Sequence, residues 1–411
     1  MVSFTRLVAL AACIVPLLAI PASPDYGFHA KVRNLNTPNY IENSWIVVYR
    51  QDITDSQIDT HEKSINSIIT KRDQTNRVAH GIKAKWHMKS LRGYHIHTNE
   101  DLISLISASP EIEYIERDTR VSALDLNTQY SAPYGLGSIS HRSAQSSSQY
   151  VYDSSSGKEV TVYIVDTGVY AEHSEFNGRA SMGANFVTGS ANTDENGHGT
   201  HCAGTIGGST YGVAKNATIV AVKVLNAEGS GSNSGVISGI NWVASNAGGS
   251  GVLSMSLGGY YSAALNQAVT STVNSGVSVI VAAGNDNANA ALYSPASAQS
   301  AVTVGAISST NAKASFSNYG SVVDVFAPGV NILSAWIGNK TSTNTISGTS
   351  MATPHVAGLA AYLIGLENLS SPNAVSNRIS SLAVNGQISG LPYNTVNRRA
   401  YNGASHGSLP R

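Results

Sequence analysis

Apolar residues in the second half of the chain form short runs that alternate with segments of helical periodicity. The run at residues 157–165 is nearly continuously apolar, as expected of a central parallel strand that is buried on both faces. Strands that alternate with helices imply an α/β parallel sheet with helices on both faces, whose active groups lie at the carboxyl ends of the strands. Further apolar runs cover residues 217–224, 251–255, 277–282 and 301–306, and helical patterns cover residues 234–247, 262–275 and 353–366.

The pattern of the first half predicts a small α+β domain that carries no catalytic constellation. β-branched and aromatic residues favour strands, whereas charged segments with spaced isoleucines favour helices. Asn99 is expected to cap a helix, with Asp101 in the first turn. Strands are predicted at residues 45–50, 91–97 and 112–121, and helices at residues 52–69 and 99–107.

The N-terminal segment has the pattern of a secretory signal. Arg6 provides a positive charge, and the apolar run at residues 7–20 is too short to span a membrane as a helix. Ala19 and Ala22 are small residues that suit cleavage near residue 20. Residues 1–20 are therefore predicted to be a signal peptide, and the product is expected to be secreted and extracellular, without a membrane anchor.

Charged residues are unevenly distributed along the chain. Among its 411 residues, 25 are basic and 25 acidic, a balance that argues against a nucleic-acid-binding protein, which normally has a basic excess. Of the first 126 residues 28 are charged, against 22 of the remaining 285, whereas 35 of the 38 glycines lie in the second part. This shift predicts two units after the signal, at residues 21–126 and 127–411.

Cysteine usage and glycosylation motifs fit a secreted product. The two cysteines are Cys13 and Cys202, and loss of the signal leaves only Cys202, so no internal disulfide is expected. A unit of this length buries enough surface to fold without one. Three sequons of the type N-x-[ST] predict glycosylation at Asn216, Asn339 and Asn368.

Three segments of the second unit supply an acid, a base and a nucleophile. Asp166 follows the first buried strand, His198 lies between two glycines, and Ser350 opens an apolar helix. A serine hydroxyl needs a neighbouring imidazole to take its proton, and the imidazole needs a buried carboxylate to fix its tautomer. Pro354 is expected in the first turn of that helix, where proline is tolerated. A metal-dependent hydrolase is the weaker alternative, because the HExxH motif is absent.

In the order Asp, His, Ser, the three segments resemble those of the subtilisin family, and most closely its proteinase K branch of secreted fungal enzymes. The resemblance covers almost all of residues 127–411, and residues 44–121 resemble the inhibitory propeptide of that family, a ferredoxin-like domain. It implies that Asp166 orients the imidazole, that His198 acts as general base and then general acid, and that Ser350 attacks the scissile carbonyl. His201 is not the base in the family pattern.

The resemblance also implies an oxyanion hole and a substrate cleft. Asn285 would donate its side-chain amide to the oxyanion, beside the main-chain amide of Ser350. Two stretches of small residues would form the walls of the primary specificity pocket, and a third would pair with the main chain of an extended substrate. The walls would be Ser256, Leu257 and Gly258 on one side and Ala282, Ala283 and Gly284 on the other, and the pairing stretch would be Gly229, Ser230 and Gly231. Broad specificity follows as an expectation, with apolar or aromatic residues favoured at P1.

A structural calcium ion is implied only by the resemblance. Asp324 matches a carboxylate ligand, and main-chain carbonyls at Gln299 and Ala301 would complete the site. One carboxylate and several carbonyls suit a hard cation. No cofactor is expected for catalysis itself.

These expectations together describe a secreted serine endopeptidase that is made as an autoinhibited precursor. Its partners would be protein or peptide substrates and its own propeptide as an intramolecular inhibitor, and a monomer is expected. The alternative is a catalytically silent subtilase that acts as a binding protein or an antigen.

Overall fold

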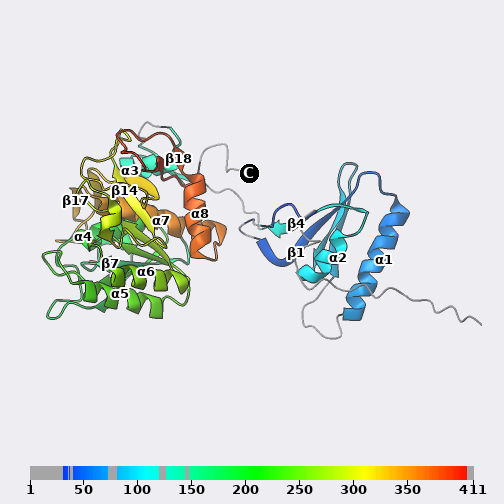
Figure 1. The fold of residues 1–411 in the computed structure, drawn as a ribbon, viewed down its shortest axis with the longest axis horizontal. Coiled ribbons are helices and arrows are strands. Elements are labelled where there is room, and N and C mark those ends of the chain that lie inside the picture. Colours follow the sequence, from blue (N-terminus) through cyan, green and yellow to red (C-terminus); the bar gives the residue numbers. More distant parts are fainter. Residues whose placement is uncertain are drawn as a thin grey trace, which may run out of the picture. The chain divides into compact units, whose positions relative to one another are not determined.

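The protein forms two compact units, Met1–Val121 and Ser122–Arg411, in a computed structural model (Figure 1). The predicted signal at residues 1–20 lies outside the described residues. Within the part that the structure describes, no helix is both long and apolar enough to cross a membrane. The structure describes residues 31–35, 37, 40–72, 81–119, 126–143 and 148–404.

The first unit is the predicted α+β domain, a four-stranded antiparallel sheet in the order β2-β3-β1-β4 with two helices. Trp45 and Val47 of β1 are buried in a core to which both helices contribute. Asn99 caps α2 as predicted, since its side chain accepts a hydrogen bond from Leu102 N. The elements are β1 (Tyr40–Tyr49), α1 (Asp55–Arg72), β2 (Gly81–His87), β3 (Arg92–His97), α2 (Glu100–Ser107) and β4 (Ile112–Thr119).

Strand β2 was not expected from the sequence. It lies at the edge of the sheet and pairs only with β3 among the described strands, and none of its residues is buried. A strand without a buried face has no need of alternating apolar residues, so its sequence carries no strand pattern.

The second unit is built on a nine-stranded sheet in the order β18-β19-β15-β14-β12-β10-β7-β9-β8. All its pairings are parallel except that of β18 with β19, as the alternation of strands and helices predicted. Its strands are β7 (Thr161–Asp166), β8 (Ala180–Asn185), β9 (Thr218–Lys223), β10 (Val252–Met255), β12 (Ser278–Ala282), β14 (Val302–Ile307), β15 (Val325–Pro328), β18 (Val384–Asn385) and β19 (Arg398–Arg399).

The two faces of this sheet bury separate cores. In β7, Val162 and Ile164 belong to the core on one face, whereas Tyr163 and Val165 belong to the core on the other. Helices α3, α4, α7 and α8 contribute to the first core, and α5 and α6, which Figure 1 shows side by side, contribute to the second. This double burial explains why the strands are apolar at nearly every position. The helices are α3 (Tyr134–Ser140), α4 (His198–Gly207), α5 (Asn233–Asn246), α6 (Ala263–Asn274), α7 (Thr349–Glu367) and α8 (Pro372–Leu382).

Short elements outside the main sheet complete the second unit. Three two-stranded sheets and two 3-10 helices lie in its connections. The strand pairs are β5 (Leu126–Gln129) with β6 (Tyr150–Asp153), β11 (Gly259–Tyr260) with β13 (Tyr293–Ser294), and β16 (Ile332–Ala335) with β17 (Thr343–Ile346), and the 3-10 helices are η1 (Ser174–Phe176) and η2 (Ala290–Leu292).

Candidate active site

The three predicted side chains come from the ends of three elements of the second unit. Asp166 is the last residue of β7, His198 is the first residue of α4, and Ser350 is the second residue of α7. The carboxyl end of a central parallel strand and the start of two helices therefore supply the site, as expected for this sheet architecture. The sheet is buried on both faces, so these ends are held on rigid elements.

Asp166 and His198 form a carboxylate–imidazole hydrogen bond, which becomes an ion pair when His198 is protonated. Asp166 Oδ1 lies 2.8 Å from His198 Nδ1 and also accepts a hydrogen bond from Thr167 N at 2.7 Å. The Asp166 side chain is fully buried, whereas the His198 side chain is 24% exposed. Burial by itself lowers the pKa of His198, but the charge and the hydrogen bond of Asp166, with Asp194, outweigh it, so that this pKa lies above 6.5. The carboxylate therefore favours the charged imidazolium and holds Nδ1 protonated.

Ser350 is tied to its neighbour Ser256 by two reciprocal hydrogen bonds. Ser350 Oγ donates to Ser256 O at 3.0 Å, and Ser256 Oγ donates to Ser350 O at 2.9 Å. The Ser350 carbonyl is free for this contact because Pro354, four residues on, has no N–H to donate to it.

Pro354 lies inside α7 rather than at its start. The helix begins at Thr349, so Pro354 is beyond its first turn, and the expectation of a first-turn proline was wrong. The helix tolerates it because side chains from other segments replace the missing bond.

Cys202 connects the serine to the other two residues of the site. Its thiol donates to Ser350 O at 3.5 Å, and its sulfur, a carboxylate oxygen of Asp166 and a ring nitrogen of His198 all lie within 4.8 Å of one another. Cys202 is fully buried, and burial raises its pKa well above the ordinary value, so the group is a neutral thiol. It is a small packed side chain beneath the site.

His201 is a packed histidine rather than a second base. Its Nε2 donates to Ile332 O at 2.9 Å, and its ring contacts Trp336 edge to face. Burial lowers its pKa to about 4, so the ring is neutral near pH 7.

Two hydrogen-bond donors converge beside Ser350. Asn285 Oδ1 accepts from both N and Oγ1 of Thr349, at 2.8 and 2.9 Å, which fixes the amide plane and leaves Nδ2 free to donate elsewhere. Asn285 Nδ2 and Ser350 N lie 3.7 and 3.6 Å from the point where a Cβ would stand on Gly348. Ser350 N is also one of the first amides of α7, where negative charge is favoured. The pair can bind an oxyanion that forms at the serine.

A pocket opens next to these donors. Five of the residues expected in its walls line it: Leu257, Gly258, Ala282, Ala283 and Gly284. Asn285 and Ser350 line it as well. Ser256 is not among the lining residues, since it is buried beneath Ser350. The remaining lining residues are Gly259, Tyr260, Asp286, Tyr293, Ser294, Ala296 and Thr349.

Asp286 gives this pocket a negative charge that sequence reasoning missed. The group is exposed, and it directly follows Asn285. Desolvation and then the Asp286 carboxylate raise the pKa of Tyr293, which places this carboxylate near the tyrosine hydroxyl. The pocket is therefore apolar in its walls and acidic at one point.

The glycine-rich stretch predicted to pair with substrate is an exposed turn. Gly229 has a φ of 75°, and Gly229 N donates to Asn226 O at 3.0 Å. Gly229, Ser230 and Gly231 belong to none of the described strands, but Gly229 N and both N and O of Ser230 already form hydrogen bonds with Asn226 within the turn. The turn lies beside the histidine segment, since Asn196 Nδ2 donates to Ala227 O at 2.8 Å.

The geometry agrees with the comparisons of the chain with known proteins. The model of the subtilase family matches residues 157–404. The chain belongs to the subtilase family. A second model, Peptidase inhibitor I9, matches residues 44–124 and so covers most of the described part of the first unit of this subtilase.

Its relatives are fungal proteases, and they match along nearly their whole length. The subtilase is 57% identical over 399 residues to "Subtilisin-like protease 2" of Pseudogymnoascus destructans, across 97% of this chain and 98% of that protein. It is 46% identical to "Cuticle-degrading serine protease" of Arthrobotrys oligospora, across 95% and 98%. Among solved structures, a cold-adapted subtilisin-like serine proteinase matches with a TM-score of 0.64 at 49% identity, over 67% of this chain and all of that one. The subtilase is therefore a serine endopeptidase with an inhibitory propeptide.

Asp324 contacts the segment that follows the other two residues expected to bind calcium. Asp324 Oδ2 accepts from Thr303 N at 2.8 Å, and Ala301 and Gln299 precede that threonine by two and four residues. Burial raises the pKa of Asp324, and no lysine or arginine of the described residues forms an ion pair with it within 4.0 Å. A half-buried carboxylate without a cationic partner fits a bound cation, which would offset the cost of burying its charge.

All three sequon asparagines are exposed. Asn216 lies before β9, Asn339 lies in the loop between β16 and β17, and Asn368 follows α7. Each is accessible to a glycan in the folded subtilase.

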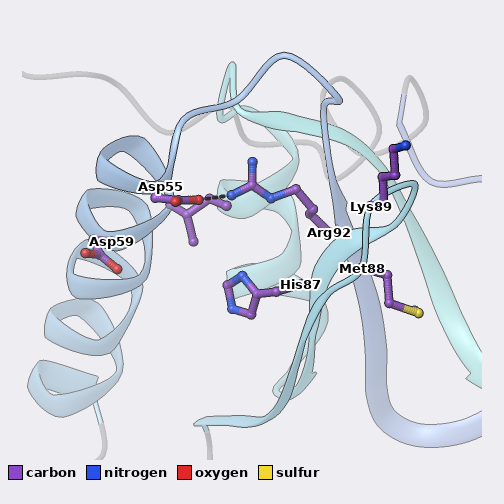
Figure 2. A pocket seen from close by; sticks show the side chains of 7 residues that line it. Asp55, Asp59, His87, Met88, Lys89 and Arg92 are labelled. Atoms are coloured by element: carbon purple, nitrogen blue, oxygen red, sulfur yellow. Dashed lines mark hydrogen bonds and ion pairs between the residues drawn. The ribbon is translucent and has the colours of Figure 1, made fainter.

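The propeptide unit has a hollow of its own, on the side of its sheet next to α1 (Figure 2). Asp55 and Arg92 pair across it, as Figure 2 shows, so their charges neutralise one another. The exposed His87 lies at its edge, and no nucleophile, base and carboxylate meet in it. The hollow therefore offers no second catalytic site.

Proposed function

We propose that this subtilase is a secreted endopeptidase of broad specificity that favours apolar or aromatic residues at P1, with Asp166, His198 and Ser350 as its catalytic residues. The observation that carries the proposal is the 2.8 Å pair of Asp166 with His198, which Cys202 links to Ser350. Ser350 N and Asn285 Nδ2 provide two oxyanion donors, and a pocket lined largely by small residues opens next to them. The silent-protein alternative is not favoured, because every group needed for acyl transfer is present.

The proposed reaction begins when the Ser350 hydroxyl releases the Ser256 carbonyl and gives its proton to His198 Nε2. Ser350 Oγ then attacks the scissile carbonyl, and the oxyanion binds Asn285 Nδ2 and Ser350 N. Asp166 stabilises the imidazolium without taking its proton. His198 next protonates the leaving amine, which breaks the C–N bond and leaves an acyl-enzyme on Ser350. Water, deprotonated by His198, attacks that ester. The C–O bond to Ser350 then breaks, His198 returns the proton to Ser350 Oγ, and the acid is released.

The proposed specificity can be tested with peptides that differ only at P1. We expect Phe, Tyr, Leu and Met to give the highest kcat/KM, because the walls of the pocket are small and apolar. Glutamate at P1 should be cleaved slowly, since it would face the Asp286 carboxylate. Asp286→Asn should raise kcat/KM for P1 glutamate about 2–5-fold, the range of one exposed charge interaction.

The matched control is the same Asp286→Asn variant on P1 phenylalanine, for which kcat/KM should stay within 2-fold of wild type. A library profile in which only lysine or arginine is accepted at P1 would contradict the proposed specificity. Equal gains for glutamate and phenylalanine would show that Asp286 does not act through its charge.

We also propose that Asp324, with the carbonyls of Gln299 and Ala301, holds a structural calcium ion. A chelator is then expected to lower the free energy of unfolding by about 3 kcal/mol and Tm by roughly 6–12 °C. This is the stabilisation expected when the free calcium concentration is well above the Kd of the site. Differential scanning calorimetry with and without excess calcium measures this shift. Asp324→Asn is the control, since the variant should melt at the same temperature with and without the ion. An unchanged Tm of the wild type after chelation would refute the site.

The remaining proposals concern secretion, oligomeric state and glycosylation. The precursor is proposed to lose residues 1–20 on secretion, and the enzyme is proposed to be a monomer. Glycans are proposed at Asn216, Asn339 and Asn368. Exposure of all three asparagines supports the glycans. Mass spectrometry of the secreted product before and after glycosidase treatment tests them, and an unchanged mass would rule them out.

A further inference from the structure

Asp194 is a buried carboxylate whose partners are all neutral. It is only 5% exposed. Among the described residues no lysine, arginine or histidine forms an ion pair with it within 4.0 Å. Its charge is stabilised instead by hydrogen bonds from Thr167 Oγ1 at 2.8 Å, Asn196 N at 3.0 Å, Gly197 N at 2.9 Å, Thr200 N at 2.8 Å and Thr200 Oγ1 at 2.6 Å.

These bonds join the two segments that carry Asp166 and His198. Thr167 directly follows Asp166, and its Oγ1 both donates to Asp194 and accepts from Gly199 N at 2.9 Å. Three other donors are main-chain amides that flank His198 at the start of α4. A single carboxylate therefore fixes the histidine turn against the end of β7, which sets the distance between Asp166 and His198.

The charge of Asp194 also acts on the imidazole. With Asp166, it raises the pKa of His198 against the opposing effect of burial. The other titratable groups near the ring are His201 and Cys202 of α4, and burial holds both of them neutral near pH 7. From β9, the buried Lys223 donates to Thr167 O at 2.7 Å and lies 3.6 Å from Glu195, an ion pair of its own. Asp194 is thus the second negative charge that the imidazolium meets.

We propose that Asp194 is a positioning residue of this protease, which holds the His198 turn against Asp166 and whose charge helps to stabilise the imidazolium formed in the reaction. It touches neither substrate nor reacting atoms, so it acts through His198. The positioning effect and the charge effect should be separable, because some hydrogen bonds to Asp194 can be removed without removing its charge.

The charge is tested by the pH dependence of kcat/KM for the mature enzyme on a tetrapeptide amide with P1 phenylalanine. The general base must be neutral, so activity is lost as pH falls through the pKa of His198. Asp194→Asn removes the charge and should move the acid limb to lower pH by about one unit, the size of a charge interaction across several ångströms at partial burial. It should also lower kcat about 10–100-fold with KM within 2-fold, because the amide nitrogen cannot accept the bonds that the lost oxygen accepted.

Thr167→Val is the matched control, since it removes one hydrogen bond to Asp194 and keeps the charge. It should lower kcat about 5–20-fold, because it removes the bond to Asp194 and the bond from Gly199 N. The acid limb should stay within 0.2 pH units of wild type, because no charge is removed. Asp194→Glu keeps the charge as well, and should also keep the wild-type limb. The proposal is overturned if Asp194→Asn, folded by circular dichroism, leaves the limb in place.

If Asp194→Asn does not fold, Thr167→Val and Thr200→Val decide the positioning role. Each removes one hydroxyl donor to Asp194. Both should lower kcat with KM nearly unchanged, and values of kcat within 2-fold of wild type for both variants would refute the role. A loss that appears only in KM would refute it equally.

Discussion

Replacing Asp166 by asparagine is expected to lower kcat about 10⁴-fold with little change in KM, as the same change does in another serine protease. The fully buried carboxylate accepts the His198 Nδ1–H at 2.8 Å, which sets the tautomer in which Nε2 can take the proton of Ser350. An asparagine has no charge to stabilise the imidazolium, and its NH₂ group can hold the opposite tautomer. Steady-state kinetics on a tetrapeptide amide measures the loss.

The same variant should also change the pH dependence of kcat/KM. Burial alone lowers the pKa of His198, and Asp166 is the largest of the effects that raise it. Without that carboxylate the pKa should fall, so the acid limb of the residual kcat/KM should move to lower pH. Near-native Tm serves as the control for folding. A loss of less than 10-fold would show that Asp166 does not orient the base.

Replacing Asn285 by alanine is expected to lower kcat about 10²–10³-fold, the loss known for one oxyanion donor in a subtilisin. Thr349 N and Oγ1 hold the amide oxygen at 2.8 and 2.9 Å, so Nδ2 is presented to the oxyanion without reorganisation. The oxyanion exists only in the tetrahedral state, so KM should change by less than about 3-fold.

Alanine also removes the acceptor of the Thr349 bonds, and Asn285→Asp separates the two effects. Aspartate keeps an oxygen for Thr349 but replaces the Nδ2 donor by a second oxygen, whose charge repels the oxyanion. Its kcat should be at least as low as that of the alanine variant, measured on the same tetrapeptide amide. Recovery of kcat with aspartate would assign the effect to the Thr349 contact instead.

Some features of this subtilase were available from the sequence because they depend on neighbours along the chain. The apolar run before Asp166, the glycines around His198 and the small residues before Ser350 are local patterns, and each marks the end of a strand or the start of a helix. Five strands of the main sheet, β7, β9, β10, β12 and β14, could be predicted because both sheet faces are covered, which requires apolar residues at successive positions. The four-residue β15 was not predicted although it is also buried. Strand β2 could not, because none of its residues is buried.

The composition of the precursor also indicated its division into two units. The charge-rich, glycine-poor part is the unit that matches the inhibitor model, and the charge-poor part is the unit that matches the subtilase model. The composition located the boundary between the two units, whereas the fold class, the serine endopeptidase activity and the propeptide followed from the strand–helix pattern, the three motifs and the resemblance to the subtilisin family.

Only the tertiary structure decided how distant segments bind one another around the site. Ser256 was expected in a pocket wall, but it lies under Ser350, 94 residues away, and takes the carbonyl that Pro354 leaves free. Asp194 drew no attention in the sequence, where it is one acidic residue in a polar loop, yet it binds Thr167 across 27 residues. Spacing along the chain identifies which groups can react, whereas hydrogen bonds between separate elements arise only when packing brings those elements together, and they fix the geometry in which the groups act.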